Sequence, residues 1–184
     1  MKTIGLIGGM SWESSLEYYR LLNQGVKARL GGLHNAKSLM VTVDFAEIAA
    51  LQRVGAWDEA AKVLSSAAQT LERGGADCVL ICTNTMHKVA DEVQAAVKIP
   101  LIHIADATAE KVVQAGIKRV GLLGTAFTME QDFYRERLLE KYGLEVLTPE
   151  QEDRGQVHRI IFDELCLGTV DAGSKLEYVR IMAG

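Results

Sequence analysis

A cysteine that ends an apolar strand and precedes a polar turn is the feature of this sequence with the clearest chemical potential. Residues 77–82 form the strand pattern, and Thr83, Asn84 and Thr85 follow Cys82. Where a strand passes into a helix, backbone N–H groups and the positive end of the helix dipole face the turn, which favours a thiolate and an incoming carboxylate. We therefore expect Cys82 to be a reactive thiol with a lowered pKa. The alternative is an inert cysteine buried at the end of a core strand.

The remaining cysteines indicate packing rather than catalysis. Cys78 lies on the same strand face as Cys82, and His87 follows the turn, but their spacing matches no common zinc pattern and a fourth ligand is missing. Cys166 follows an apolar helical stripe, so we expect it to pack. Three widely spaced cysteines do not form a disulfide framework. We predict neither a metal site nor a disulfide.

The histidines and one group of glycines could also belong to a site. His87 and His103 lie near strand ends, and His34 and His158 lie in polar surroundings. We expect each of them to be a hydrogen-bonded structural residue. The Gly5-x-x-Gly8-Gly9 spacing matches neither the dinucleotide fingerprint nor the P-loop. We expect these glycines to let the backbone approach a small ligand.

The elements that would position these residues alternate along the chain. Strand patterns cover residues 2–8, 38–45, 77–82, 100–104 and 118–124, and helical patterns end near residue 30 or cover 60–71, 88–97 and 106–115. Ser14-x-x-Glu17, Thr128-x-x-Gln131 and Thr148-Pro149-x-Gln151 resemble helix starts. This alternation predicts an α/β fold with doubly wound parallel sheets.

An internal repeat indicates two similar units. Residues 2–9 return, with four of eight positions identical, as residues 118–125, and Tyr18-Tyr19-Arg20 returns as Phe133-Tyr134-Arg135. We predict two pseudo-symmetric α/β units, residues 1–98 and 99–184. The same offset would place the counterpart of Cys82 at position 197 or 198, beyond Gly184, so we expect the second unit to be incomplete and truncated before its catalytic cysteine.

Composition limits the classes of partner. The net charge is −4, charged residues are interspersed, and 48% of residues are hydrophobic, so the chain can bury a core and presents no basic stripe for nucleic acid. No apolar run approaches the roughly 20 residues that span a bilayer, and the N-terminus lacks a signal sequence. We predict a cytoplasmic protein that binds neither nucleic acid nor a membrane.

Four motifs in order resemble the aspartate/glutamate racemase family, and most closely its broad-specificity amino-acid racemases. The motifs are residues 7–14, 82–87, 123–125 with 127–134, and 160–166. The resemblance implies a cofactor-independent racemase with two α/β domains, each supplying one catalytic cysteine. The second cysteine of the family lies in a Gly-Cys-Thr-Glu motif that this chain does not reach, so activity is expected to be impaired.

The resemblance also implies roles for individual residues. Cys82 would exchange a proton at the substrate Cα by thiol/thiolate chemistry. Substrate contacts would come from Met10, Gln52, Thr83, Asn84, Thr85 and Thr125. Ile48 and Cys166 stand near positions where relatives specific for acidic substrates place cationic groups, which favours broad specificity. The partners expected are a small amino-acid substrate and, because an incomplete unit exposes apolar surface, a second copy in a homodimer.

Two other functions fit the same residues. The first is a one-cysteine decarboxylase or an enzyme like maleate isomerase, in which Cys82 protonates or attacks a small carboxylate. The second is a non-catalytic remnant that binds an amino acid without turnover.

Overall fold

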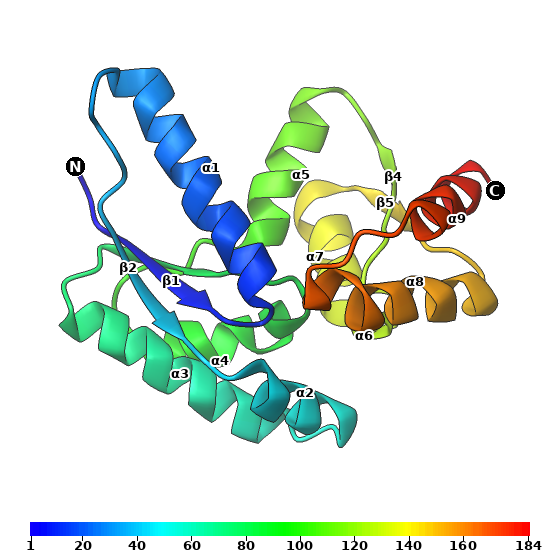
Figure 1. Ribbon diagram of the computed structural model, residues 1–184, viewed down its shortest axis with the longest axis horizontal. Helices are drawn as coiled ribbons and strands as arrows, with labels where there is room; N and C mark the ends of the chain where they lie inside the picture. The colour runs from blue at the N-terminus through cyan, green and yellow to red at the C-terminus, as the bar shows by residue number, and fades with distance from the viewer. The chain divides into compact units, whose positions relative to one another are not determined.

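Two units divide the chain, which the computed structural model describes from residue 1 to residue 184 (Figure 1). Unit 1 comprises Met1–His103 and unit 2 comprises Ile104–Gly184. The boundary expected from the sequence, between residues 98 and 99, lies close to this division. That the two units are pseudo-symmetric and that the second is incomplete stay predictions.

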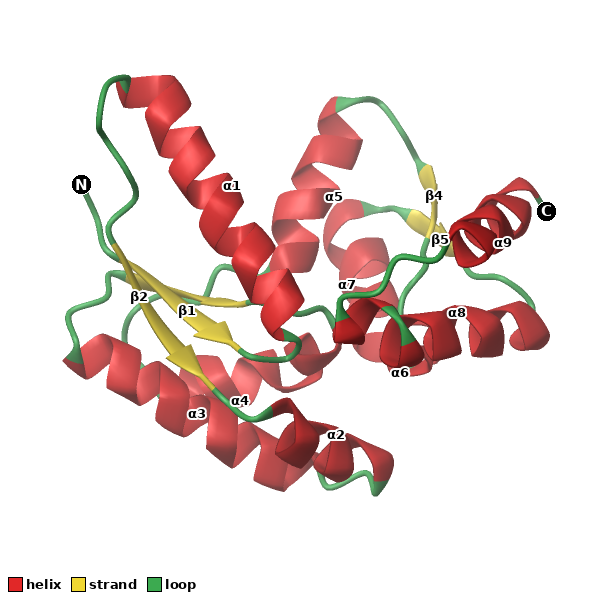
Figure 2. Cartoon of the chain, in the orientation of Figure 1, coloured by secondary structure: helices red, strands yellow, loops and turns green.

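Unit 1 contains a three-stranded sheet with the order β2-β1-β3, in which both strand pairs are parallel. Its elements are β1 (Ile4–Gly8), α1 (Trp12–Leu30), β2 (Ser38–Thr42), α2 (Phe45–Arg53), α3 (Trp57–Arg73), β3 (Cys78–Ile81), the 3-10 helix η1 (Thr85–Val89) and α4 (Ala90–Ala95). Helix α1 lies on one face of the sheet, and α3 and α4 lie on the other (Figures 1 and 2). The predicted parallel α/β arrangement is confirmed.

The core of unit 1 lies between the sheet and α3. Leu64 and Ala68 of α3 are fully buried, and they belong to one cluster with Ile7 of β1 and Val79 of β3. These α3 residues belong to the 3.6-residue apolar pattern expected between residues 60 and 71, so that pattern identified the buried helix face correctly.

Unit 2 contains a short parallel sheet of β4 and β5 surrounded by helices (Figure 2). Its elements are α5 (Ile104–Gln114), β4 (Arg119–Gly121), α6 (Ala126–Glu130), α7 (Asp132–Tyr142), β5 (Glu145–Leu147), α8 (Gln151–Asp163), the 3-10 helix η2 (Leu165–Leu167) and α9 (Ala172–Ala183). One core cluster centres on Ala109 and Leu138, and another on Val157 and Ile181. An ion pair of Asp106 with Arg137 (2.7 Å) links α5 to α7.

Three expected helix starts differ from the structure. Helix α1 begins at Trp12 after Ser11, before the expected Ser14 start. Helix α6 begins after Thr125, whose side chain accepts a hydrogen bond from the backbone N–H of Thr128. Helix α8 begins after Glu150, so Pro149 precedes the helix and does not occupy its first turn.

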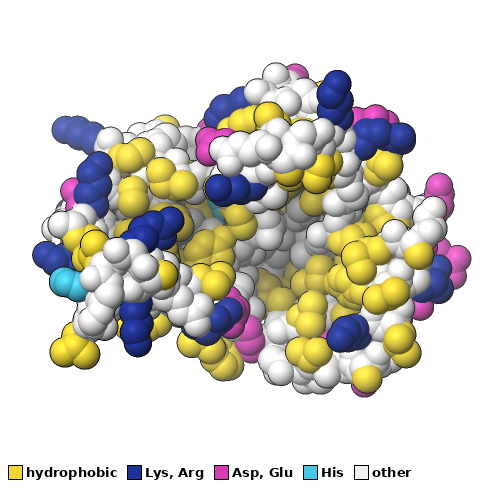
Figure 3. All heavy atoms as spheres, turned by 90° about the horizontal axis from the view of Figure 1, so that it is seen from above, with side chains coloured by type: hydrophobic (Ala, Val, Ile, Leu, Met, Phe, Trp, Pro, Cys, Tyr) yellow, Lys and Arg dark blue, Asp and Glu magenta, His cyan; other side chains and the backbone are white.

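The surface mixes charges of both signs. Lys, Arg, Asp and Glu side chains are interspersed on the face drawn in Figure 3. No helix combines the length and apolar character that crossing a membrane requires.

Candidate functional site

The turn that carries Cys82 begins where the sheet of unit 1 ends. Strands β1, β2 and β3 are parallel, so Gly8, Thr42 and Ile81 end at the same edge of the sheet. The backbone N–H of Cys82 donates to the carbonyl of Ile7 (2.9 Å). Ligands bind at this carboxyl edge in open α/β sheets. The edge therefore places Cys82 where a site is expected.

The side chain of Cys82 is fully buried. Burial disfavours the charged thiolate and raises the pKa of the Cys82 thiol to about 12. The lowered pKa expected from the sequence is therefore wrong for this structure. Its assumed cause is also weak, because the helix that follows the turn is a short 3-10 helix of five residues rather than a long α-helix.

His87 fastens the turn that follows Cys82. Its ring Nδ1 lies 2.7 Å from the carbonyl oxygen of Thr83, and its backbone N–H donates to the carbonyl of Asn84 (3.0 Å). A carbonyl oxygen only accepts, so Nδ1 carries the proton in this hydrogen bond. The rings of His87 and His103 are both buried and meet edge to face, with centroids 4.4 Å apart. The structural role expected for these histidines agrees with this geometry.

The polar residues of the turn differ in exposure. Thr83 is half-buried, Asn84 is exposed and Thr85 is buried. Asn84 precedes η1 without a side-chain capping bond. The turn therefore carries polar residues that range from exposed to buried.

Gln52 brings a buried amide close to the turn. It lies on the same face of α2 as Ile48, and both side chains are buried. Its Nε2 donates to Sδ of Met86 (3.0 Å), whereas its buried Oε1 has no hydrogen-bond partner. A buried acceptor left without a donor is costly, by about 1–3 kcal/mol. Met10, expected to contact substrate, packs in the same core cluster as Met86.

The loop after β1 is fixed by serines and glycines. The hydroxyl of Ser14 donates to the carbonyl of Cys82 (2.6 Å), and the Ser15 Oγ accepts from the backbone N–H of Gly9 (2.9 Å). Gly9 has φ +93°, and a Cβ built on it would lie 2.2 Å from the carbonyl oxygen of Val43. The glycine is therefore required by contact with the protein's own backbone, whereas the sequence suggested contact with a ligand.

Thr125 belongs to unit 2 and starts α6. The next residue, Ala126, donates its backbone N–H to Nδ1 of His158 (3.1 Å). His158 contacts the rings of Phe127 and Phe162, with centroids 5.8 and 4.7 Å away. The polar surroundings expected for His158 are thus wrong, because the surrounding aromatic residues come from another helix and from a later turn of its own helix.

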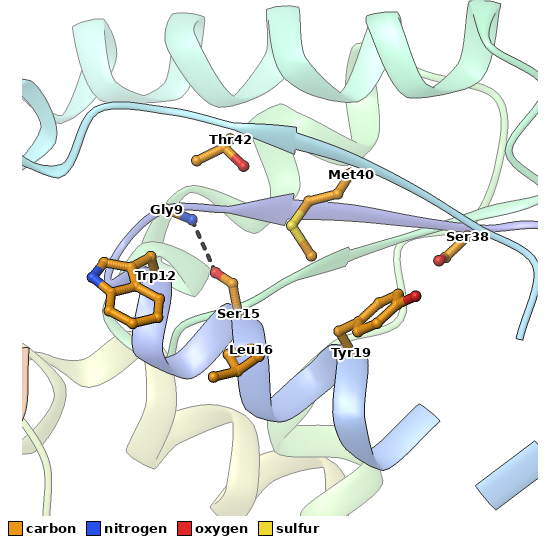
Figure 4. Close-up of a pocket in the computed structure, with 8 residues that line it drawn as sticks. All are labelled: Gly9, Trp12, Ser15, Leu16, Tyr19, Ser38, Met40 and Thr42. Carbon is orange, nitrogen blue, oxygen red and sulfur yellow. Dashed lines mark hydrogen bonds between the residues drawn. The ribbon is translucent and has the colours of Figure 1, made fainter. Parts of the chain in front are cut away.

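A cavity of about 490 Å³ lies between α1 and β2 of unit 1 (Figure 4). Trp12, Leu16 and Tyr19 reach it from α1, and Met40 reaches it from β2. Of the residues that the sequence analysis placed near a ligand, only Gly9 lines this cavity, whereas Cys82 and the predicted substrate contacts do not. Its walls are mainly apolar and contain the hydroxyl groups of Ser15, Ser38 and Thr42 but no cysteine. No group of three or more His, Cys, Asp or Glu side chains in the chain could hold a metal ion.

Sequence reasoning missed two residues that shape the turn. Ser14 was assigned to a helix cap, although its hydroxyl bonds the Cys82 carbonyl. His87 was recognised only as structural, and its position four residues after Thr83 gave no direct sign of the bond to that carbonyl. A Ser-rich segment directly after a Gly-Gly strand end is the signal that could have pointed to Ser14.

Comparison with known proteins supports one family. A 90-residue segment is 32% identical to the broad-specificity amino-acid racemase RacX of Bacillus subtilis and covers 49% of this chain but only 39% of RacX. A crystal structure from Yersinia pestis assigned as an Asp/Glu racemase is 57% identical, with a TM-score of 0.89, over 98% of this chain and 79% of the other. An aspartate racemase homologue from Pyrococcus horikoshii is 38% identical, with a TM-score of 0.78, over 92% of this chain and 74% of the other. Because the sequence profile of Asp/Glu/hydantoin racemases also matches residues 7–183, the chain belongs to that family.

Proposed function

We propose that this chain acts on amino acids by thiol/thiolate proton transfer at Cα, without a cofactor, with Cys82 as the catalytic residue. The observation that carries the proposal is the position of Cys82 at the carboxyl edge of the unit 1 sheet, in a member of a racemase family. The family relationship supplies the reaction class. The position of Cys82 in unit 1 supports the choice of its sulfur as the reacting atom.

The proposed step moves one proton and creates no other covalent bond. The Cys82 thiolate takes the proton from Cα, which leaves a carbanion-like substrate and a neutral thiol. Return of a proton from the same sulfur restores the same face of the substrate. Inversion requires an acid on the opposite face. The 184 residues contain no Gly-Cys-Thr-Glu motif, so we propose that this polypeptide exchanges the Cα proton but does not interconvert the L and D forms.

Because the Cys82 thiol is buried and neutral, substrate binding must expose the sulfur and favour its ionisation. Because burial raises the pKa of the Cys82 thiol to about 12, almost every Cys82 side chain is neutral at pH 7. The sulfur also has no exposed surface, so a change in conformation must admit the substrate. We propose that exchange is slow for this reason and accelerates as the pH rises.

Binding of the α-carboxylate and ammonium groups is proposed for the turn and α2. Thr83, Asn84 and Thr85 supply hydroxyl, amide and backbone groups. The unpartnered Oε1 of Gln52 can accept a hydrogen bond from an ammonium group. The resemblance assigns contacts to Met10 and Thr125 as well, and these stay proposals.

Broad specificity is the second part of this proposal. Ile48 is neutral and lies one turn from Gln52 on the buried face of α2. A neutral residue here offers no charge that selects a substrate side-chain carboxylate. Cys166, on the other unit, is also uncharged.

Deuterium exchange tests the catalytic assignment. Purified protein is incubated in D₂O with L-alanine, L-glutamate and L-lysine, and loss of the Cα–H signal is followed by NMR while chirality is followed by chromatography. We expect slow exchange with retained chirality in the wild type and loss of exchange in Cys82→Ala. Cys166→Ser is the matched control, because it removes a half-buried thiol that has no proposed role in proton transfer and leaves the position uncharged.

Two results would contradict the proposal. Exchange that persists in Cys82→Ala would remove the catalytic role of the thiol. Accumulation of the D form by mass-verified 184-residue chain would refute the one-face mechanism. Binding of these amino acids without any exchange would instead support a non-catalytic binding protein.

A one-cysteine lyase or isomerase remains the alternative, since only one cysteine lies at the carboxyl edge of the unit 1 sheet. Malonates and maleate added to the same assay distinguish it, because Cys82-dependent turnover of either would replace the racemase assignment. The cytoplasmic location and the homodimer stay proposals. Sedimentation over a range of protein concentrations tests the homodimer.

A further inference from the structure

We propose that His158 is a positioning residue for Thr125: its neutral ring holds the backbone where α6 begins, and protonation of the ring releases that backbone and weakens substrate binding. This inference rests on the function proposed above, in which Thr125 contacts the substrate. It adds a residue that the motifs do not assign and a direction for the pH dependence.

The hydrogen bond determines which nitrogen of His158 carries the proton. The backbone N–H of Ala126 can only donate, so Nδ1 of His158 must accept it with an unprotonated lone pair. The neutral ring therefore carries its proton on Nε2. A second proton would have to bind at Nδ1, where it would face the Ala126 N–H and destroy the bond.

This bond acts directly next to Thr125. Ala126 is the first residue of α6, and its N–H is one of the donors that a helix start leaves without an intrahelical partner. Thr125 precedes it and accepts backbone hydrogen bonds from Thr128 (2.9 Å) and Met129 (3.0 Å) through its carbonyl. His158 thus ties the start of α6 to α8, and losing this tie frees the peptide that carries Thr125.

The surroundings of His158 favour the neutral ring. The rings of Phe127 and Phe162 flank it and provide no charge. Burial lowers the pKa of His158 below its ordinary value, and the opposing effects of Asp163 and Glu130 are smaller.

Other charged groups occur on the elements that contact α8. Glu130 of α6 is paired with Arg154 of α8 itself at 3.0 Å. Glu164 accepts from the Ser174 hydroxyl, Arg180 of α9 pairs with Asp153 and Glu177, and Lys175 is the other cation of α9. Most of these charges are thus already paired, so they offer limited support to a protonated ring.

The expected pH dependence follows from these facts. At pH values well above the ordinary histidine pKa of about 6.5, the ring is neutral and the bond is intact. As the pH falls through the lower pKa of the folded protein, the ring is protonated and the bond is lost. Loss of one such hydrogen bond should weaken substrate binding by roughly fivefold.

The experiment measures L-alanine affinity and the backbone signal of Ala126 in the same samples from about pH 5 to pH 7.5, the range in which histidine titrates. L-alanine keeps both α-group charges over this range. Calorimetry gives the dissociation constant, and ¹⁵N-labelled protein gives the Ala126 amide shift and the ring titration of His158. In the wild type we expect the dissociation constant to rise as the amide shift follows the ring.

Three variants separate positioning from simple stability. His158→Asn places an oxygen acceptor near the Nδ1 position without a titrating group, so the acid-side loss of affinity should disappear. His158→Phe keeps an aromatic ring but no acceptor, so affinity should be low at every pH. His34→Asn is the matched control, because His34 is exposed and lies in a loop of unit 1, and it should behave as the wild type.

The outcomes are distinguishable. The inference is overturned if the Ala126 amide shift does not change as His158 titrates. It is also overturned if His158→Asn still loses affinity for L-alanine at acid pH. If L-alanine does not bind at any pH, the substrate contact of Thr125 fails together with the proposed function. If the Ala126 amide shift still follows the titration of His158 in that case, the hydrogen bond is supported and only the proposed function is refuted.

Discussion

Two opposing effects act on the thiol of Cys82, and their sizes decide its resting state. A helix end stabilises a nearby charge by about 0.3–1 kcal/mol, which corresponds to less than one pKa unit. Burial without a charged partner has the larger effect here and raises the pKa to about 12. Without substrate, the Cys82 side chain is therefore a neutral thiol. The reactivity inferred from the sequence requires that substrate binding change the surroundings of the sulfur.

The buried thiol also predicts a pH dependence of stability. The unfolded chain ionises Cys82 near its ordinary pKa of about 8.5. The folded chain keeps the proton up to about pH 12, so between these values the folded state binds more protons than the unfolded state. The contribution to the free energy of unfolding is complete below the lower value and falls as the pH rises.

Urea unfolding at about pH 7 and about pH 10, on either side of the ordinary thiol pKa, measures this contribution. We expect the wild type to lose more stability between the two conditions than Cys82→Ala, although the variant is less stable at pH 7 because it leaves a small cavity. Cys166→Ala, which alters another cysteine, should follow the wild type. Equal losses in wild type and Cys82→Ala would show that the folded protein does not hold this proton.

Helices and strands that are marked by a pattern within their own residues were predicted correctly from the sequence. The apolar spacing of α3 identified its buried face, and the strand before Cys82 was predicted to within one residue of β3. Helix α2 was missed because the strand pattern was extended to Phe45. The sequence contained a helix-start signal, Asp44 followed three residues later by Glu47. In the structure the Asp44 side chain accepts from the Ala46 N–H, and Glu47 lies in the first turn.

Contacts between distant segments could not be predicted in this way. The hydroxyl of Ser14, near the start of α1, donates to the carbonyl of Cys82, which lies 68 residues later in the chain. The environment of His158 depends on an aromatic ring from α6. Periodicity finds a face of a helix, but it does not identify which distant residue meets that face.

The loop after β1 provides a test at the same scale. Gly9→Ala would place a Cβ 2.2 Å from the Val43 carbonyl oxygen at φ +93°. We expect it to lower the free energy of unfolding by about 2–4 kcal/mol, because the backbone must move to relieve the contact. Urea unfolding measures the change.

Gly155→Ala is the matched control for that substitution. Gly155 lies inside α8, and no neighbouring atom lies within 4 Å of the position that the alanine methyl group would occupy. Alanine should stabilise the helix by about 0.5–1 kcal/mol. A Gly9→Ala protein as stable as the wild type would show that the loop adapts without cost.

At the scale of the whole molecule, each unit has the components of a separate folding unit. Unit 1 contains one large apolar cluster around Leu64, and unit 2 contains its own clusters, one of them around Leu138. The internal sequence repeat suggests the same organisation. If the two units unfold separately, damage to one core should leave the stability of the other unchanged.

The distribution of tryptophan makes this prediction measurable in the intact chain. Both tryptophans, Trp12 and Trp57, belong to unit 1, so their fluorescence reports unit 1 alone, whereas circular dichroism reports the helices of both units. Leu64→Ala should lower the stability seen by fluorescence by about 2–5 kcal/mol. Leu138→Ala should shift only the part of the dichroism transition that fluorescence does not see. If Leu138→Ala shifts the tryptophan transition equally, the units unfold as one cooperative structure, and the two-domain organisation inferred from the repeat does not extend to stability.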